Sequence, residues 1–247
     1  MISEGQHFRV PIAVEPLADG KLIVADSEYA PNVGKLIVVD PSQPSTSNQS
    51  LLLPSGGPNE FYWVTGMSVA PPGAPNAGKI YVSDVGNVFG AGAHRNTPPR
   101  KIIEVDPGSG DHTVLFSGEN DLGFTSSGVE ITTPHYPVGI DVDVETGDLV
   151  IADALGRKVW RMAPAPGAPL FELSVDPDFV QPTHVVIHGT LSSGTVFVTD
   201  AKAYAPVGQR LLHRVDPSQP KESNSTIFTQ DGILTEPRGL EVIPKLP

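Results

Sequence analysis

The chain repeats one seven-residue block four times: a glycine, a variable residue, three apolar or aromatic residues, a small residue and an aspartate. The four copies run from Gly20 to Asp26, from Gly78 to Asp84, from Gly147 to Asp153 and from Gly194 to Asp200. A block of this length does not recur four times by chance. The chain is therefore an array of related units, and the repeat indicates its architecture.

Three more short apolar runs accompany each block. One follows the aspartate and ends at a proline, in segments 35–41, 101–107, 158–164 and 211–217. Another precedes the glycine and begins at Ile12, Met67, Ile140 and Val185. The last follows the proline, in segments 51–53, 113–116, 170–173 and 226–228. Four runs rich in Val, Ile, Leu and aromatics, separated by turn-forming residues, predict a four-stranded antiparallel meander in each unit.

We therefore predict an all-β fold, a β-propeller of four-stranded antiparallel blades, because no segment has the apolar stripe of a long helix and blades bury their faces against their neighbours. As a single domain over 1–247, its repeats span roughly 8–60, 61–130, 131–178 and 179–232, with the first strand of a fifth unit in 233–247. This fifth strand leaves three alternatives: a partial propeller, a C-terminal strap that closes a small ring, or two chains that complete each other. We favour the partial propeller.

The third unit carries a resemblance to a known family. Its sequence PVGIDVDVETGDLVIADALGRKVWRM, from Pro137 to Met162, resembles an NHL-type propeller repeat. The same pattern covers nearly the whole chain. NHL blades occur in many bacterial secreted proteins and in some lyases and lactonases, so the resemblance implies a propeller and an exported or extracellular protein. It implies little about activity, because propellers host many unrelated functions.

Charge and composition exclude several classes of function. The net charge is −12 and the 16 Lys and Arg residues are scattered, so we do not expect nucleic-acid binding. No apolar run approaches the length of a membrane span, and the first eleven residues lack the basic flank and apolar core of a signal peptide. The absence of cysteine removes disulfides, thiol nucleophiles and Cys-ligated metals.

The longest variable segments predict the binding face. In a propeller blade, the loop that leads into the first strand lies on the same face as the hairpin between the second and third strands. The insertion from Val85 to Lys101 and the loop from Ser117 to Pro137 occupy these two places. Loops that vary on a rigid scaffold often carry function, so we expect a protein or small-molecule ligand here. The ligand-contacting residues that we predict are Tyr62, Phe89, His94 and Arg95.

The four repeat aspartates lie on the same rim. They are Asp26, Asp84, Asp153 and Asp200. A ring of carboxylates could hold a hard cation. An aspartate that recurs in every blade more often accepts hydrogen bonds from backbone N–H groups in the next turn. We therefore predict a structural role for these residues.

Residues that depart from the repeat suggest an alternative function. His135 and Tyr136 precede the first strand of the third unit, His184 replaces a glycine in the fourth, and Arg238 begins the fifth. Such groups can hold a metal or transfer protons. The resemblance to propeller lyases implies a catalytic role for these four residues, with a divalent cation such as Ca²⁺ or Zn²⁺ in the central channel near His135 and His184. A calcium-dependent lactonase is a second enzymatic option.

The sequence thus favours a binding module that acts through its loop-bearing face. The alternative is a lyase or hydrolase with a metal at the channel mouth. An open ring would also expose sheet edges, and this predicts self-association.

Overall fold

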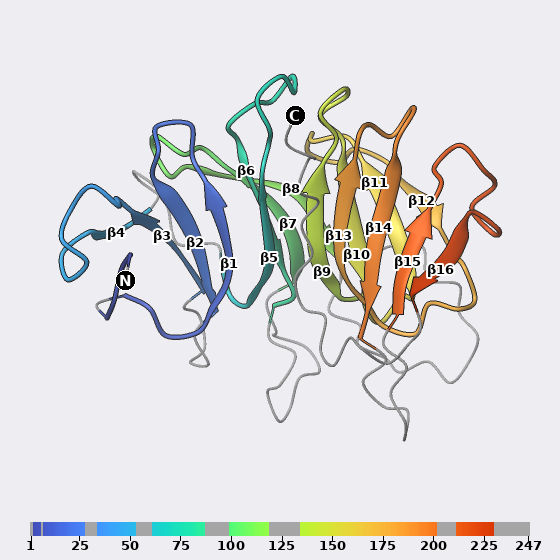
Figure 1. Ribbon diagram of the computed structural model, residues 1–247, viewed down its shortest axis with the longest axis horizontal. Coiled ribbons are helices and arrows are strands. Elements are labelled where there is room, and N and C mark those ends of the chain that lie inside the picture. The colour runs from blue at the N-terminus through green and yellow to red at the C-terminus, as the bar shows by residue number, and fades with distance from the viewer. Residues whose placement is uncertain are drawn as a thin grey trace.

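The structure is a computed structural model, which describes residues 2–5, 7–27, 34–52, 61–86, 99–118, 134–201 and 211–229. The prediction of an all-β propeller with four-stranded antiparallel blades is confirmed, because the described residues form four such sheets. Blades 1 to 4 follow one another in chain order (Figure 1). Within these ranges there is no helix, and hence none long and apolar enough to cross a membrane.

Each blade is a meander whose strands pair in sequence order. Blade 1 contains β1 (Pro11–Pro16), β2 (Leu22–Ser27), β3 (Gly34–Val39) and β4 (Gln49–Leu51). Blade 2 contains β5 (Val64–Val69), β6 (Ile80–Asp84), β7 (Arg100–Val105) and β8 (His112–Gly118). Blade 3 contains β9 (Pro137–Val142), β10 (Leu149–Asp153), β11 (Lys158–Met162) and β12 (Leu170–Ser174). Blade 4 contains β13 (Pro182–His188), β14 (Thr195–Asp200), β15 (Leu211–Val215) and β16 (Ser225–Thr229).

The glycine of the repeated block lies in the turn between the first and second strands. Gly20, Gly78 and Gly147 have φ values of 83°, 82° and 77°. Only glycine adopts this left-handed region without a steric cost. In blade 4 a different glycine has the positive φ in this turn, because it is Gly189, at 87°, that adopts the left-handed conformation. A Cβ on Gly194 would lie 2.3 Å from the carbonyl oxygen of His188, so the block glycine is needed for space instead.

Apolar residues of the inner three strands fill the spaces between blades. One buried cluster joins blades 1 and 2, a second joins blades 2 and 3, and a third joins blades 3 and 4. The first strands make contact in the order β1, β5, β9 and β13. In the part of the chain that the structure describes, β13 does not pack on β1 as these neighbours pack on one another. The four blades therefore form an arc with two outer faces.

Each repeat aspartate ties its second strand to the segment that leads into the first strand. The donors are the backbone N–H groups of Arg9 and Val10 for Asp26, Tyr62 and Trp63 for Asp84, His135 and Tyr136 for Asp153, and Val180 and Gln181 for Asp200. All four carboxylates are buried. Gly86 and Gly156 in the following turns donate further bonds to Asp84 and Asp153. Pairing every carboxylate with two N–H groups satisfies donors that the short strands leave free.

Candidate functional site

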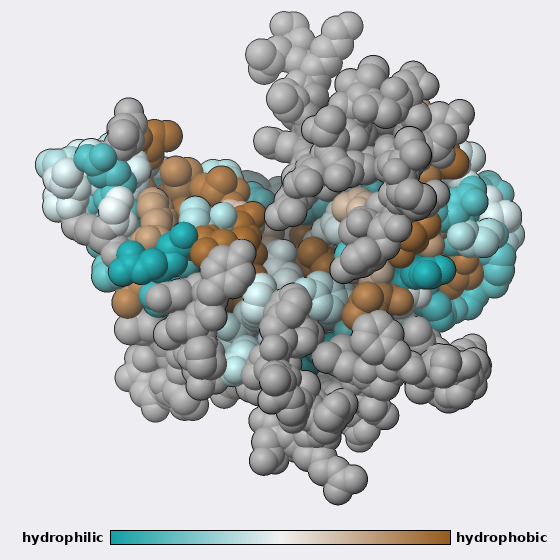
Figure 2. Space-filling model, turned by 90° about the horizontal axis from the view of Figure 1, so that it is seen from below, coloured by the Kyte–Doolittle hydropathy of each residue, from teal (hydrophilic) through white to brown (hydrophobic). Residues whose placement is uncertain are grey.

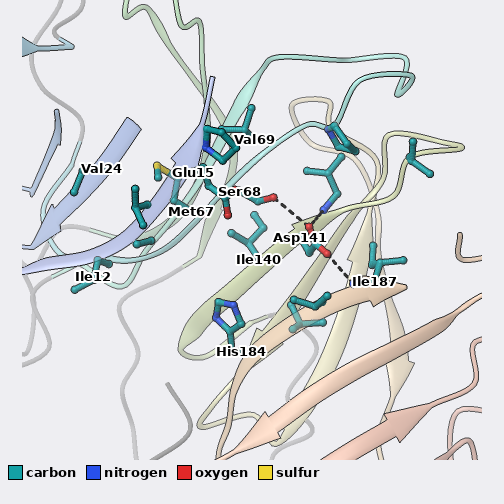
Figure 3. A pocket seen from close by; sticks show the side chains of 18 of the residues that line it. Ile12, Glu15, Val24, Met67, Ser68, Val69, Ile140, Asp141, His184 and Ile187 are labelled. Atoms are coloured by element: carbon teal, nitrogen blue, oxygen red, sulfur yellow. Dashed lines mark hydrogen bonds between the residues drawn. The ribbon is translucent and has the colours of Figure 1, made fainter. Parts of the chain in front are cut away.

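A cavity of about 1150 Å³ lies along the first strands of all four blades. Its wall is formed mainly by residues 11–16, 67–69, 140–142 and 184–188, which belong to β1, β5, β9 and β13. Most of these side chains are apolar. Figure 3 shows Ile12, Met67 and Ile140 along the wall, with the imidazole of His184 projecting into the cavity from β13.

Side chains of the first strands alternate between two directions. Met67, Ile140 and Val185 point toward the preceding blade and belong to the apolar clusters between blades. Ser68 and Asp141, which follow Met67 and Ile140, instead bond across to the next blade. A Cβ on Gly66 would lie 1.9 Å from the carbonyl oxygen of Val138, so the first strands of blades 2 and 3 approach too closely for any side chain at this point.

Asp141 joins three blades in the cavity wall. Its carboxylate accepts a hydrogen bond from the Ser68 hydroxyl of blade 2 at 3.2 Å and one from the Ile187 N–H of blade 4 at 2.7 Å (Figure 3). It also accepts the neighbouring N–H of Val142 at 2.8 Å. Burial raises the pKa of the Asp141 carboxyl, in opposition to these three donors. The residue therefore fixes the spacing of β5, β9 and β13.

Asp143 makes a second link between blades 3 and 4. It accepts the N–H of Leu191 at 3.0 Å and, through its other oxygen, the hydroxyl of Thr146 at 2.7 Å. Asp141 lines the cavity and Asp143 is fully buried behind it, and both carboxylates are bonded to protein donors. A ligand in the cavity would thus meet a wall that is preorganised by internal hydrogen bonds.

The predicted catalytic residues occupy different environments. His184 lines the cavity. His135 and Tyr136 are not among the lining residues, and their backbone N–H groups bind Asp153 at 2.8 Å each. The carbonyl oxygen of His135 accepts a 2.7 Å bond from Arg100 Nη1. Arg238 lies outside the described residues. Of the predicted set, His184 is thus the residue that the structure places in a cavity wall.

The predicted ligand contacts fall mostly on parts of the chain that are not described. Phe89, His94 and Arg95 lie outside the described residues. Tyr62 is described, and its backbone N–H binds Asp84 just before β5. The role of these four residues in binding stays a prediction.

The described residues offer no ready donor set for a divalent cation. Across the described ranges, no group of three or more His, Cys, Asp or Glu side chains is arranged to hold a metal ion. The oxygens of Asp153 and Asp141 are already occupied by N–H and hydroxyl donors. The described residues therefore do not fit a divalent cation.

Sequence reasoning did not single out Asp141 or Ser68. A signal was present, because a carboxylate within an otherwise apolar first strand, as in Ile140-Asp141-Val142, is unusual for a buried face. The hydrogen bonds that explain it come from blades 2 and 4. Their sequence separations of 73 and 46 residues are not encoded in any local pattern.

The buried imidazole of His213 leads us to predict that the stability of the fold depends on pH. It lies in β15, its ring is tilted against that of Phe179 with 4.6 Å between ring centroids, and its Nδ1 is 3.1 Å from Ser225 Oγ. Burial lowers the pKa of the imidazole even though three carboxylates nearby oppose this effect. The unfolded chain therefore takes up a proton first when the pH falls below about 6.5, and the folded state loses stability.

We expect the free energy of unfolding to decrease as the pH falls from about 6.5, by up to about 1.4 kcal/mol per pH unit from this residue. The variant His213→Phe should lose this part of the slope, whereas the exposed control His188→Gln should keep it. Urea denaturation at a series of pH values measures the slopes. Equal slopes in wild type and His213→Phe would contradict the assignment.

Comparisons with known proteins agree on the fold. No protein-family profile matches the chain, and no curated protein sequence matches it. Among solved structures, the chain resembles nidogen in its complex with laminin, with 16% identity over 89% of this chain and 64% of that one and a TM-score of 0.55. It also resembles a streptogramin B lyase, with 13% identity, 94% and 58% coverage and a TM-score of 0.56.

A gluconolactonase from Xanthomonas campestris is similar to the same degree, with 12% identity, 88% and 61% coverage and a TM-score of 0.56. At such low identity, these likenesses show the β-propeller fold alone. The chain spans about three-fifths of the length of each of these three structures. The resemblance to NHL repeats in particular stays a prediction.

Proposed function

We propose that the chain is a binding module for a protein or small-molecule ligand, and that the cavity along the four first strands is its binding site. The observation that carries this proposal is the cavity itself, because its volume is about 1150 Å³ and residues from all four blades line it. Ligand sites are concave, mostly apolar and marked by a few polar groups. Here the polar groups are His184, His188, Glu15 and the bonded pair of Ser68 and Asp141.

The chemistry of the wall favours an apolar ligand that is neutral or cationic. Ile12, Val14, Met67 and Val186 supply apolar surface, and Glu15 is the acidic residue of β1 in the lining. The net charge of −12 adds a negative potential that disfavours anions. An apolar segment of a partner protein would meet the same requirements as a small molecule. The nidogen structure, which was solved in a complex with laminin, is consistent with a protein ligand.

The uncharged fluorescent dye Nile red is a suitable probe for this wall. We expect the folded protein to bind it with an increase in fluorescence, and we expect Val186→Asp to weaken binding by roughly tenfold or more, because it places a charge in the apolar wall. Phe171→Asp is the matched control, since Phe171 is 59% exposed on β12 and does not line the cavity. Equal weakening by both variants, or no binding to wild type, would contradict the proposal.

Two observations support the enzymatic alternative. His184 lines the cavity, and solved structures of similar fold include a lyase and a gluconolactonase. A thermal shift produced by Ca²⁺ or Zn²⁺ and abolished in His184→Ala would favour this alternative over the binding module. A shift that persists in His184→Ala would place the ion elsewhere.

A further inference from the structure

The side of β1 that faces away from β2 is an exposed part of the cavity wall. Within the described ranges β1 pairs with β2 alone, so this side is a free strand edge, which we call the inner edge of β1. Val14 lines the cavity and is 58% exposed. The residues at its register position in the other three blades are at most 3% exposed; they are Met67, Ile140 and Val185. At this position β1 is therefore open to a ligand, whereas the other first strands are covered. In Figure 2, brown apolar side chains are visible in the part of the view that β1 to β3 occupy.

The register of the β1–β2 pair shows which backbone groups face the inner edge. The N–H of Leu17 donates to the carbonyl oxygen of Lys21 at 2.8 Å, at the turn that joins the two strands. Hydrogen-bonded positions alternate along an antiparallel pair, so Glu15 and Ala13 direct their N–H and C=O groups to β2. Val14 lies between them and directs its own N–H and C=O groups to the inner edge. One donor and one acceptor of β1 thus face the cavity.

In blades 3 and 4 the protein itself occupies backbone groups on the equivalent edge. Asp141 accepts the N–H of Val142 at 2.8 Å and the N–H of Ile187 at 2.7 Å. These two residues share one register position, and in blade 1 that position is held by Pro16, which has no N–H group. Blade 1 therefore needs no built-in acceptor at this position. Its edge can accept a strand beside Val14.

The size of the cavity favours an extended chain as the occupant. Sites for small molecules usually have volumes of about 300 to 1,000 Å³, and this cavity has about 1150 Å³. The six residues of β1 extend over about 20 Å. A free strand edge is a template for strand addition, in which main-chain hydrogen bonds supply affinity and alternate side chains supply specificity.

The two faces of β1 indicate which side chains an added strand would carry. Val14 pairs with Val24, which belongs to the apolar cluster on the face away from blade 2. Ala13 packs in the cluster between blades 1 and 2, and Glu15 alternates to that same face. Figure 3 agrees, because it shows Glu15 near Ser68 of β5. Paired residues share a face, so an apolar residue suits the place opposite Val14. The net charge of −12 favours a Lys or Arg on the face of Glu15.

We propose that the cavity binds an extended segment of a partner protein, which adds to the inner edge of β1 as a further strand of blade 1. Apolar side chains of the segment lie on the face of Val14, and a Lys or Arg lies on the face of Glu15. This inference rests on the proposed function, because it names the class of ligand for the same cavity. Nile red tests the cavity alone. A wild type that binds the dye but not a peptide would overturn this inference and leave the proposed function standing.

Fluorescence polarisation tests strand addition. The probe is a fluorescein-labelled peptide that alternates four threonines with four valines around a central lysine, Thr-Val-Thr-Val-Lys-Val-Thr-Val-Thr. Wild type should bind it saturably. Val14→Pro removes the N–H that faces the inner edge, and it should weaken binding by roughly tenfold or more. Proline is tolerated in an edge strand where its nitrogen makes no ladder bond. Val14→Thr keeps the N–H and the shape of the side chain, so it should weaken binding by no more than about threefold. Circular dichroism and the Tm verify that both variants fold.

Two methylated peptides test the main-chain pairing itself. The residue opposite Val14 shares its face and directs its own N–H to β1. N-methylation of the two valines beside the lysine should therefore weaken binding by roughly tenfold or more. N-methylation of the two threonines nearest the lysine changes the other edge of the peptide and should leave the Kd unchanged. Equal losses with the two methylated peptides would overturn the proposal, as would equal binding by Val14→Pro and Val14→Thr.

Sedimentation equilibrium identifies a different occupant of the same edge. Wild type without peptide should give the mass of one chain, because the proposed occupant is a partner segment. A wild-type dimer that dissociates in Val14→Pro would mean that a second copy of the chain occupies the inner edge of β1, and it would overturn the proposal.

Discussion

Replacing Asp153 with alanine is expected to lower the free energy of unfolding by on the order of 4 kcal/mol. The carboxylate is fully buried and accepts hydrogen bonds from the N–H groups of His135, Tyr136 and Gly156 at 2.8 to 2.9 Å. It also accepts the indole N–H of Trp160 at 3.1 Å. Alanine would leave these donors without a partner in a region that water does not reach, and each such group is costly to bury.

Two further variants give stability losses with which the loss in Asp153→Ala can be compared. Asp153→Asn keeps the shape and one acceptor oxygen, so it should lose roughly half as much stability. Asp148→Ala removes an aspartate of the same blade whose side chain pairs with Arg161 at the surface, and it should cost about 1 kcal/mol or less. Urea denaturation followed by the fluorescence of the adjacent Trp160 measures all three. A loss in Asp153→Ala as small as that in Asp148→Ala would show that the aspartate does not hold the blade together.

Gly66→Ala is expected to destabilise the fold by about 3 kcal/mol or more, although it adds one methyl group. That methyl would lie 1.9 Å from the carbonyl oxygen of Val138 and 2.9 Å from Ser83 Oγ. The oxygen belongs to the backbone of β9, so it can move only if blade 3 moves. Blades 2 and 3 would therefore separate, and the apolar cluster between them would loosen.

Gly108→Ala is the matched control for this substitution. Gly108 lies in the turn between β7 and β8, where the nearest atom to a new Cβ is a side-chain oxygen of Asp106 at 3.3 Å. Its effect on the free energy of unfolding should stay within about 0.5 kcal/mol. Thermal and urea denaturation of both variants test the difference. Equal stabilities of the Gly66 and Gly108 variants would mean that the first strands of blades 2 and 3 are not packed backbone to backbone.

The fold was predictable because its signals are local and repeated. The block from Gly147 to Asp153 encodes a turn, a buried second strand and a carboxylate within seven residues, and four copies of it exclude most other architectures. Even the structural use of the aspartates could be inferred, although their main partners proved to be N–H groups of the residues just before the first strand. The sequence pointed to the following turn, which contributes one bond to Asp153.

The candidate site was harder to predict because it is assembled between blades. His184 was recognised as a departure from the repeat, and it lines the cavity. His135 looked equivalent in sequence, yet its N–H is bound to Asp153 and it is not a lining residue. Asp141 acquires its role from Ser68 and Ile187, which lie in other blades. The direction in which a first-strand side chain points decides these roles, and the bulge near the start of each first strand changes that direction.

The most direct test of the central claim, that the wall of first strands is a binding site, is a methyl NMR titration with Nile red. We expect chemical-shift changes concentrated in the methyl groups of Val14, Met67, Ile140 and Val186, which line the cavity from all four blades. Leu170 of β12 and Ile227 of β16, in the outermost strands, should not respond. Shifts confined to these outer strands, or no shifts at saturating dye, would contradict it.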